Sequence, residues 1–353
     1  MLRNKIVTAI LSAGLVFASQ AQAETKVGFV YVGPVGDHGW SYQHDQGRQD
    51  LEKALGVKTT FVESVPEGAD AERVIRQLAS SGNDIIFTTS FGYMNPTLKV
   101  AKRFKKVKFE HATGYKRAAN LSTYSSRFYE GRAILGTIAG KMTKSNVVGY
   151  IGSFPIPEVV RGIDAFTLAL RKVNPKATVK VVWVNSWFDP GKESDAAKTL
   201  IDQGADILTQ HTDSPAPLQV AEKRGIYAFG QASDMKAFAP NAQLTSIVDN
   251  WSDYYISRVK AVMDGSWKST DTWGGIKANM VKMAPYGDAV PADVRKLADG
   301  VKQSIVDGSF HPFQGPIKNQ KGELVVKAGE VLSDKDLAGL NWYVEGVEGS
   351  MPQ

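Results

Sequence analysis

Short apolar runs alternate along most of this chain with longer segments in which apolar side chains recur every three to four residues. The run "KVGFVYV" (26–32) is followed by the polar, glycine-rich stretch "GPVGDHGWSY" (33–42), where a helix is expected to begin near Gly39. Uninterrupted apolar runs are typical of parallel strands covered on both faces, and the longer period is typical of amphipathic helices. The pattern predicts an α/β fold built on parallel sheets.

The chain contains this unit twice. The run "VGFV" (27–30) returns as "VGYI" (148–151), "LASSGNDIIFTTS" (78–90) as "LIDQGADILTQHT" (200–212), and "LKVAKRF" (98–104) as "LQVAEKR" (218–224). The offset stays at about 121 residues. A repeat of this length in the same order predicts two similar Rossmann-like lobes.

The division into lobes follows from the repeat. We expect residues 24–144 with about 244–270 in the first lobe, and residues 145–243 with about 271–310 in the second. The chain then crosses between lobes near 144–147, 241–246 and 269–273, which makes a three-crossover hinge. Residues 311–353 are expected to form a C-terminal tail that packs on one lobe through Trp342 and Tyr343.

The loops that follow the strands predict the site, because ligands of open α/β sheets bind outside the carboxyl ends of the strands. In the first copy these loops are 33–41, 64–67, 90–93 and 112–115, and in the second they are 153–157, 185–189, 211–214 and 232–234. Aromatic and polar side chains gather there, as in small-molecule clefts. The candidate ligand-binding residues are Asp37, His38, Trp40, Ser41, Ser90, Phe91, Trp187, Asp213, Asp234 and Asp249.

Several of these candidates have a plainer alternative role. Asp37 is placed to cap the helix that begins near Gly39, and Asp234 to bond its own loop. Phe91 is equally suited to cap the first sheet, and His38 to remain a solvated loop histidine. Trp40 and Trp187 are the strongest candidates, because they stand on loops of opposite lobes and a planar ligand fits between them.

The first residues resemble an export signal. Basic Arg3 and Lys5 precede an apolar stretch and the small-x-small sequence Ala21-Gln22-Ala23. We therefore expect a mature chain from Glu24 in the periplasm. The sequence has Cys 0, which excludes disulfides and a cysteine-based lipid anchor.

Other function classes find little support. The formal net charge is +6 with scattered basic residues, so a nucleic-acid partner is not expected. The five histidines show no ligand spacing, so neither a metal site nor a cofactor is expected. Neither a GxSxG elbow nor a Walker loop occurs, and the glycine spacing at Gly33, Gly36 and Gly39 differs from a dinucleotide fingerprint.

At this point the residues resemble a known family, the basic membrane protein or purine nucleoside receptor group of type I periplasmic binding proteins. The resemblance rests on an ordered set of segments: "GDHGWSYQHDQG", "FYEGRAILGTIAGKMTKSNVVGYIG", "PIPEVVRGIDAFTLAL", "SWFDPGKESDAAKTLIDQGAD", "GIYAFGQASDM" and "LTSIVDNW". It implies that two aromatics, Trp40 and Trp187 here, sandwich a purine.

The departures from the family pattern are informative. Where the family has an Asp and a Lys that hold the ribose hydroxyls, this chain has Ala232 and Asp249, and the acid that is common near "EHATG" is replaced by Ala112 or Thr113. A free nucleobase such as adenine is therefore the preferred ligand.

The resemblance implies a monomeric receptor that binds a small molecule and docks on an inner-membrane ABC permease, with no enzymatic activity. A periplasmic nucleoside hydrolase and a ligand sensor that feeds a signalling receptor remain as alternatives.

Overall fold

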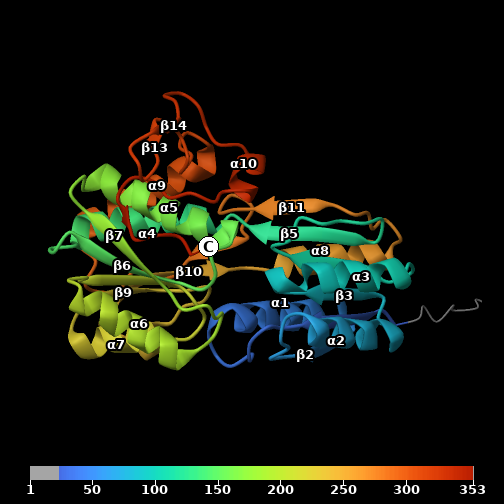
Figure 1. Cartoon of the computed structure of the whole chain (residues 1–353). Coiled ribbons are helices and arrows are strands. Elements are labelled where there is room, and N and C mark those ends of the chain that lie inside the picture. The colour runs from blue at the N-terminus through green and yellow to red at the C-terminus, as the bar shows by residue number, and fades with distance from the viewer. Residues whose placement is uncertain (1–23, 353) are drawn as a thin grey trace, which may run out of the picture.

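The computed structural model describes residues 24–352, so the expected signal peptide lies outside the described residues. Two sheets of mainly parallel strands, each covered by helices on both faces, form two lobes side by side (Figure 1). This is the α/β architecture with two Rossmann-like lobes that the hydrophobic pattern predicts.

The first lobe holds a sheet of six parallel strands. Its spatial order is β11 (Asp271–Gly274), β5 (Leu121–Ser126), β4 (Lys108–Ala112), β3 (Ile85–Thr88), β1 (Lys26–Val30) and β2 (Lys58–Val62). One face is covered by α1 (Gly39–Leu55) and α8 (Ser252–Met263), and the other by α2 (Ala69–Ser80) and α3 (Met94–Arg103), which follows the short η1 (Phe91–Tyr93).

The sequence pattern explains these elements. All four residues of β3 are buried, as expected for a strand covered on both faces. The buried residues of α2 are Ala71, Val74, Ile75, Leu78 and Ala79, a spacing that places them along one stripe of the helix.

The second lobe repeats the strand order of the first. Its sheet runs β12 (Val281–Met283), β10 (Gln243–Asp249), β9 (Tyr227–Gly230), β8 (Ile207–His211), β6 (Val147–Gly152), β7 (Thr178–Trp183) and β15 (Val347–Glu348). Helices α4 (Phe128–Met142), α5 (Pro157–Val173) and α9 (Ala292–Asp307) cover one face, and α6 (Pro190–Asp202) and α7 (Ala216–Arg224) the other, with η2 (Lys236–Phe238) after β9. Strand β12 is antiparallel to β10, whereas β11 is parallel to β5.

The lobe boundaries differ from the expected division at three places. Strand β10 pairs in the second sheet, β11 pairs in the first, and α4 packs on α5 of the second lobe. The chain therefore passes between the lobes around residues 127, 250–251 and 275–280. Helix α4 belongs to the second lobe because its small residues allow close contact with α5: a Cβ on Gly136 would meet the Phe166 carbonyl oxygen at 2.2 Å.

The C-terminal tail packs on the second lobe. It contains the hairpin strands β13 (Ile317–Lys318) and β14 (Leu324–Val326), helix α10 (Asp334–Ala338) and strand β15, which extends the second sheet beside β7. The Tyr343 hydroxyl accepts a hydrogen bond from the Trp183 indole at 3.1 Å, and Asp334 forms an ion pair with Arg127 at 2.7 Å. The tail thereby contacts both the sheet and the first crossing.

Candidate functional site

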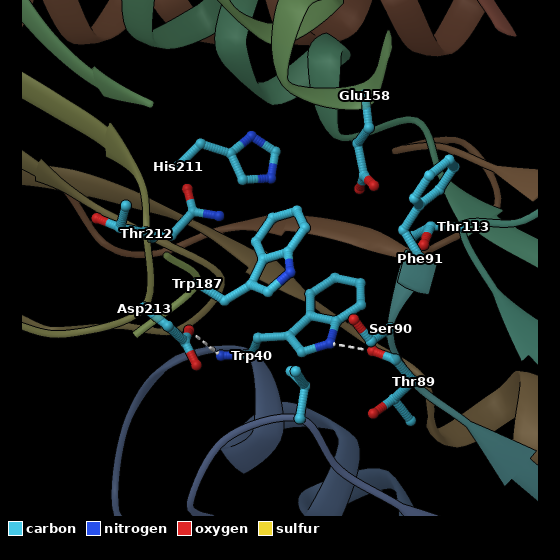
Figure 2. Close-up of a pocket in the computed structure, with 12 residues that line it drawn as sticks. Trp40, Thr89, Ser90, Phe91, Thr113, Glu158, Trp187, His211, Thr212 and Asp213 are labelled. Carbon is cyan, nitrogen blue, oxygen red and sulfur yellow. Dashed lines mark hydrogen bonds between the residues drawn. The ribbon is translucent and has the colours of Figure 1, made fainter. Parts of the chain in front are cut away.

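A cavity lies between the lobes, at the carboxyl ends of both sheets (Figure 2). The space free of protein atoms at this site, counted together with the solvent at its opening, is about 450 Å³. The lining residues are Val32, Trp40, Thr89, Ser90, Phe91, Thr113, Glu158, Trp187, His211, Thr212, Asp213 and Gln231. Each lobe contributes several of them, so the cavity is formed only when the lobes are together.

Trp40 is held firmly in the first turn of α1. Gly39, with φ of +82°, and the extended His38 turn the chain into the helix. The Trp40 indole N–H donates to the Thr89 carbonyl at 2.6 Å, and its backbone N–H donates to the Asp213 carboxylate of the other lobe. The first bond fixes the orientation of the indole, and the second joins the Trp40 backbone to the other lobe.

Trp187 enters the cavity from the second lobe, on the loop after β7. Its ring packs beside Phe154 at 5.1 Å and His211 at 6.4 Å between centroids. Its indole N–H donates across the lobes to Glu67 Oε1 at 3.3 Å. Both indoles that the sequence singled out therefore lie in one cavity.

Further hydrogen bonds join the lobes around the cavity. The Gly39 N–H donates to the Ser233 hydroxyl at 2.7 Å, and the Gln43 amide donates to the Asp249 carbonyl at 2.6 Å. Together with the bonds of Trp40 and Trp187, they make this structure a closed form.

Two carboxyl groups of the second lobe line the cavity. Burial raises the pKa of Asp213 to about 7, an effect increased by Glu193 and reduced by the N–H groups of Trp40 and Ser41. Glu158 lies in the first turn of α5, where burial raises its pKa and the Arg161 charge opposes the rise. These groups offer acceptor oxygens to the N–H donors of a ligand.

His211 supplies a neutral polar group to the lining of the same cavity. Burial, followed by the charges of Arg132 and Arg161, lowers the pKa of this imidazole well below its usual range. Its Nδ1 has no hydrogen-bond partner in the described residues and is buried. A neutral imidazole presents one donor and one acceptor to a ligand.

Arg132 supports the cavity from behind. The fully buried guanidinium donates to Thr209 Oγ1 at 3.0 Å, to the Gln210 carbonyl at 2.7 Å and to Gln231 Oε1. Because Gln231 lines the cavity, this contact orients its amide. The sequence analysis did not single out Arg132.

Five predicted site residues line the cavity, namely Trp40, Ser90, Phe91, Trp187 and Asp213, and five do not. The Asp37 side chain is 79% exposed and bonds His38 at 2.8 Å, and the cap of α1 is His38 itself. The buried Ser41 hydroxyl accepts from Gly33 N–H at 3.2 Å. These residues shape the loop that presents Trp40.

His38, Asp234 and Asp249 also lie away from the cavity lining. The His38 ring packs against the Phe238 ring of the second lobe, with 4.9 Å between the ring centroids. Exposed Asp234 accepts from the Lys236 N–H at 3.0 Å, the own-loop role named as its alternative. Asp249 is fully buried, and burial raises the pKa of its carboxyl well above the usual range.

Seven lining residues were not among the predicted site residues: Val32, Thr89, Thr113, Glu158, His211, Thr212 and Gln231. All but Glu158 stand within two residues of the carboxyl end of a strand, so the same rule that identified Ser90 points to them. Glu158 lies one residue beyond the expected loop 153–157, in a helix that begins with Pro157.

Two further searches concern residues 24–352. No group of three or more His, Asp or Glu side chains in this range is arranged to hold a metal ion. No helix in the same range is both long enough and apolar enough to cross a membrane.

Comparison with known proteins agrees with this geometry. A family model described as ABC transporter substrate-binding protein, PnrA-like, matches residues 24–311. The chain is 60% identical over 338 residues to a purine-binding protein from Brucella abortus (strain 2308), covering 95% of this chain and 96% of that protein. It is 37% identical over 326 residues to a putative ABC transporter glucose-binding protein from Haloferax volcanii, covering 92% and 80%.

Solved structures show the same fold. An ABC transporter solute-binding protein from Aeropyrum pernix has a TM-score of 0.71 at 19% identity, covering 84% of this chain and 93% of that one. One from Conexibacter woesei has a TM-score of 0.65 at 22% identity, covering 81% and 98%. With the matching family model and the 60% identical relative, these findings show that the chain belongs to the PnrA-like family of ABC transporter substrate-binding proteins.

Proposed function

We propose that this protein is a periplasmic receptor that binds a purine between Trp40 and Trp187 and delivers it to an inner-membrane ABC permease. The observation that carries the proposal is the interlobe cavity in which the two indoles, one from each lobe, lie among carboxyl, imidazole and amide groups. The 60% identity to a purine-binding protein supports the same ligand class.

Stacking on the faces of the ring and hydrogen bonding at its edge have different roles in binding. An aromatic face contributes roughly 1–3 kcal/mol to the binding of a base and tolerates any flat ring. Selectivity then depends on the ring edge, where Asp213 and Glu158 offer acceptors for N–H groups. The Gln231 amide, whose oxygen accepts from Arg132, offers its N–H donors. A ring that leaves these buried groups unpaired is rejected.

A nucleobase is preferred to a nucleoside for two reasons. The twelve lining residues include neither Lys nor Arg, so the cationic donor that the family resemblance expects at the ribose is missing from the cavity wall. At the two positions that correspond to ribose contacts, Ala232 has only a methyl group and the Asp249 carboxyl is fully buried.

The receptor cycle follows from the closed form. A ligand that contacts both lobes stabilises the closed state relative to the open state and so shifts the equilibrium between them. The permease then recognises the closed form of a monomeric receptor, and the ligand is released without chemical change.

Isothermal titration of ligand-stripped protein tests the proposal, with adenine, guanine, xanthine, adenosine and glucose as separate titrants. We expect tight binding of a base, much weaker binding of its nucleoside and no heat from glucose. Equal or tighter binding of adenosine would contradict the nucleobase preference. The absence of binding heat with every purine would refute the proposal that the protein is a purine receptor.

A second experiment addresses the hydrolase alternative. The protein is incubated with adenosine, and the mixture is separated by chromatography. We expect adenosine to be recovered intact, whereas release of adenine with turnover would show an enzyme.

A further inference from the structure

Glu67 is an exposed carboxylate that joins the two lobes beside the cavity without lining it. Its Oε1 atom accepts hydrogen bonds from three donors. Two belong to the first lobe, the Ser90 hydroxyl at 2.5 Å and the Gly92 N–H at 3.1 Å, and the third is the Trp187 indole N–H of the second lobe at 3.3 Å.

The first-lobe contacts hold this carboxylate in position whether or not the lobes are together. Ser90 and Gly92 stand at the start of η1, within the same lobe as Glu67. A Cβ on Gly92 would lie 2.1 Å from the Glu67 Cδ, so glycine at this position is what allows the carboxylate to approach the backbone. The Glu67 carboxylate is therefore in position before lobe closure brings the Trp187 indole next to it.

The contact to Trp187 has the opposite property, because it exists only in the closed form. A tryptophan has two side-chain torsions, and here the ring is packed beside Phe154 while its N–H edge is tied to Glu67. Fixing that edge fixes the plane of the indole that faces the cavity.

We propose that Glu67 is a closure latch, a positioning residue that aligns the Trp187 indole and slows the opening of the lobes. Its effect on ligand release rests on the proposed function, since it takes the bound ring to lie against Trp187. Its effect on the lobes does not depend on which ligand binds.

The latch predicts a kinetic signature. Because the bond forms after the lobes meet, its loss speeds ligand dissociation and leaves association nearly unchanged. A hydrogen bond to a charged acceptor accounts for about a tenfold change in the dissociation rate.

Lobe closure is measured directly with two spin labels. The chain has Cys 0, so Lys53→Cys on α1 and Lys198→Cys on α6 give one label on each lobe at exposed positions. The interlobe distance distribution is recorded for the labelled parent, Glu67→Ala and Glu67→Gln, each with and without adenine. Glu72→Ala is the matched control, because the Glu72 carboxylate pairs with Lys99 inside the first lobe at 2.7 Å.

We expect Glu67→Ala to reduce the ratio of the short-distance to the open population about tenfold, and Glu72→Ala to resemble the parent. Glu67→Gln keeps an acceptor oxygen without the charge, so its ratio should lie between those of Glu67→Ala and the parent. A parent without a short-distance component, or one that Glu67→Ala leaves unchanged, would overturn the latch. Failure of adenine to bind the parent, with the Glu67→Ala effect intact, would refute the purine ligand and leave the latch standing. Where adenine binds, stopped-flow dissociation is expected to be about tenfold faster in Glu67→Ala, and an equal rate would count against it.

Discussion

Gly39→Ala should weaken ligand binding more than its backbone strain alone explains, because the added methyl group meets the opposite lobe. A Cβ at Gly39 would lie 2.3 Å from Asp213 Oδ1 and 2.8 Å from the Asp213 carbonyl oxygen. Rotation of the Asp213 side chain relieves the first overlap but not the second, which involves the backbone. The lobes must therefore separate slightly.

The magnitude has two parts with different consequences. The φ of +82° adds roughly 1–2 kcal/mol of left-handed strain, which is present in open and closed forms alike and so cancels in binding. The interlobe overlap is present only in the closed form, and overpacking of this kind costs about 1–3 kcal/mol. That penalty weakens affinity by about 5- to 150-fold.

Gly36→Ala is the matched control on the same loop. Gly36 has φ of +52°, and a Cβ there would meet no atom within 4 Å, so the substitution introduces strain without an interlobe contact. Titration with adenine and urea unfolding are performed on both variants and the parent. We expect similar losses of unfolding free energy in the two variants and a loss of affinity in Gly39→Ala alone. Equal losses of affinity, or parental binding by Gly39→Ala, would refute the reasoning.

Four further predictions concern stacking, pH and the glycines of two helices. Trp40→Ala removes an aromatic face worth roughly 1–3 kcal/mol, so adenine affinity measured by titration should fall by about 5- to 150-fold, with Trp40→Phe nearer the parent. Burial raises the pKa of Asp213 to about 7, so the folded protein holds a proton that the unfolded chain releases; the free energy of unfolding should decline as pH rises from about 4 to about 7, and Asp213→Asn should flatten that decline in melting-temperature profiles. Gly136→Ala places a methyl group 2.2 Å from the Phe166 carbonyl and should destabilise by about 1–3 kcal/mol in urea unfolding. Gly300→Ala, in a helix with open space around it, should stabilise by about 0.5–1 kcal/mol in the same assay.

The local pattern of the sequence predicted the elements and their order. Apolar runs such as "IIFT" became strands buried on both faces, and the repeat returned as two sheets with the same strand order. The ends of the strands then located the cavity, where Trp40, Ser90 and Trp187 meet. Each of these results depends only on neighbours in the chain and on the general rule for ligand sites in parallel sheets.

Sheet membership was decided by tertiary structure. Strands β10 and β11 join sheets other than those expected, because the residues of a strand near a lobe boundary do not specify which of two similar sheets it pairs with. The glycines of α4 indicate that this helix packs closely against another helix. The sequence does not show that the other helix is α5 of the second lobe, because α4 and α5 meet only in the folded lobe.

The sequence by itself determined the type of fold and the loops of the site, while the tertiary structure decided which side chains of those loops face the ligand. Asp37 and Asp234 both lie on expected loops, but the Asp37 side chain faces solvent and the Asp234 side chain bonds the backbone of its own loop. The Asp213 side chain instead accepts a hydrogen bond from the first turn of α1. Glu158 reaches the cavity from a helix start. Strand ends are fixed by local hydrophobic periodicity, but the direction of a loop side chain depends on backbone torsions and on contacts with the other lobe, which form only when distant segments come together.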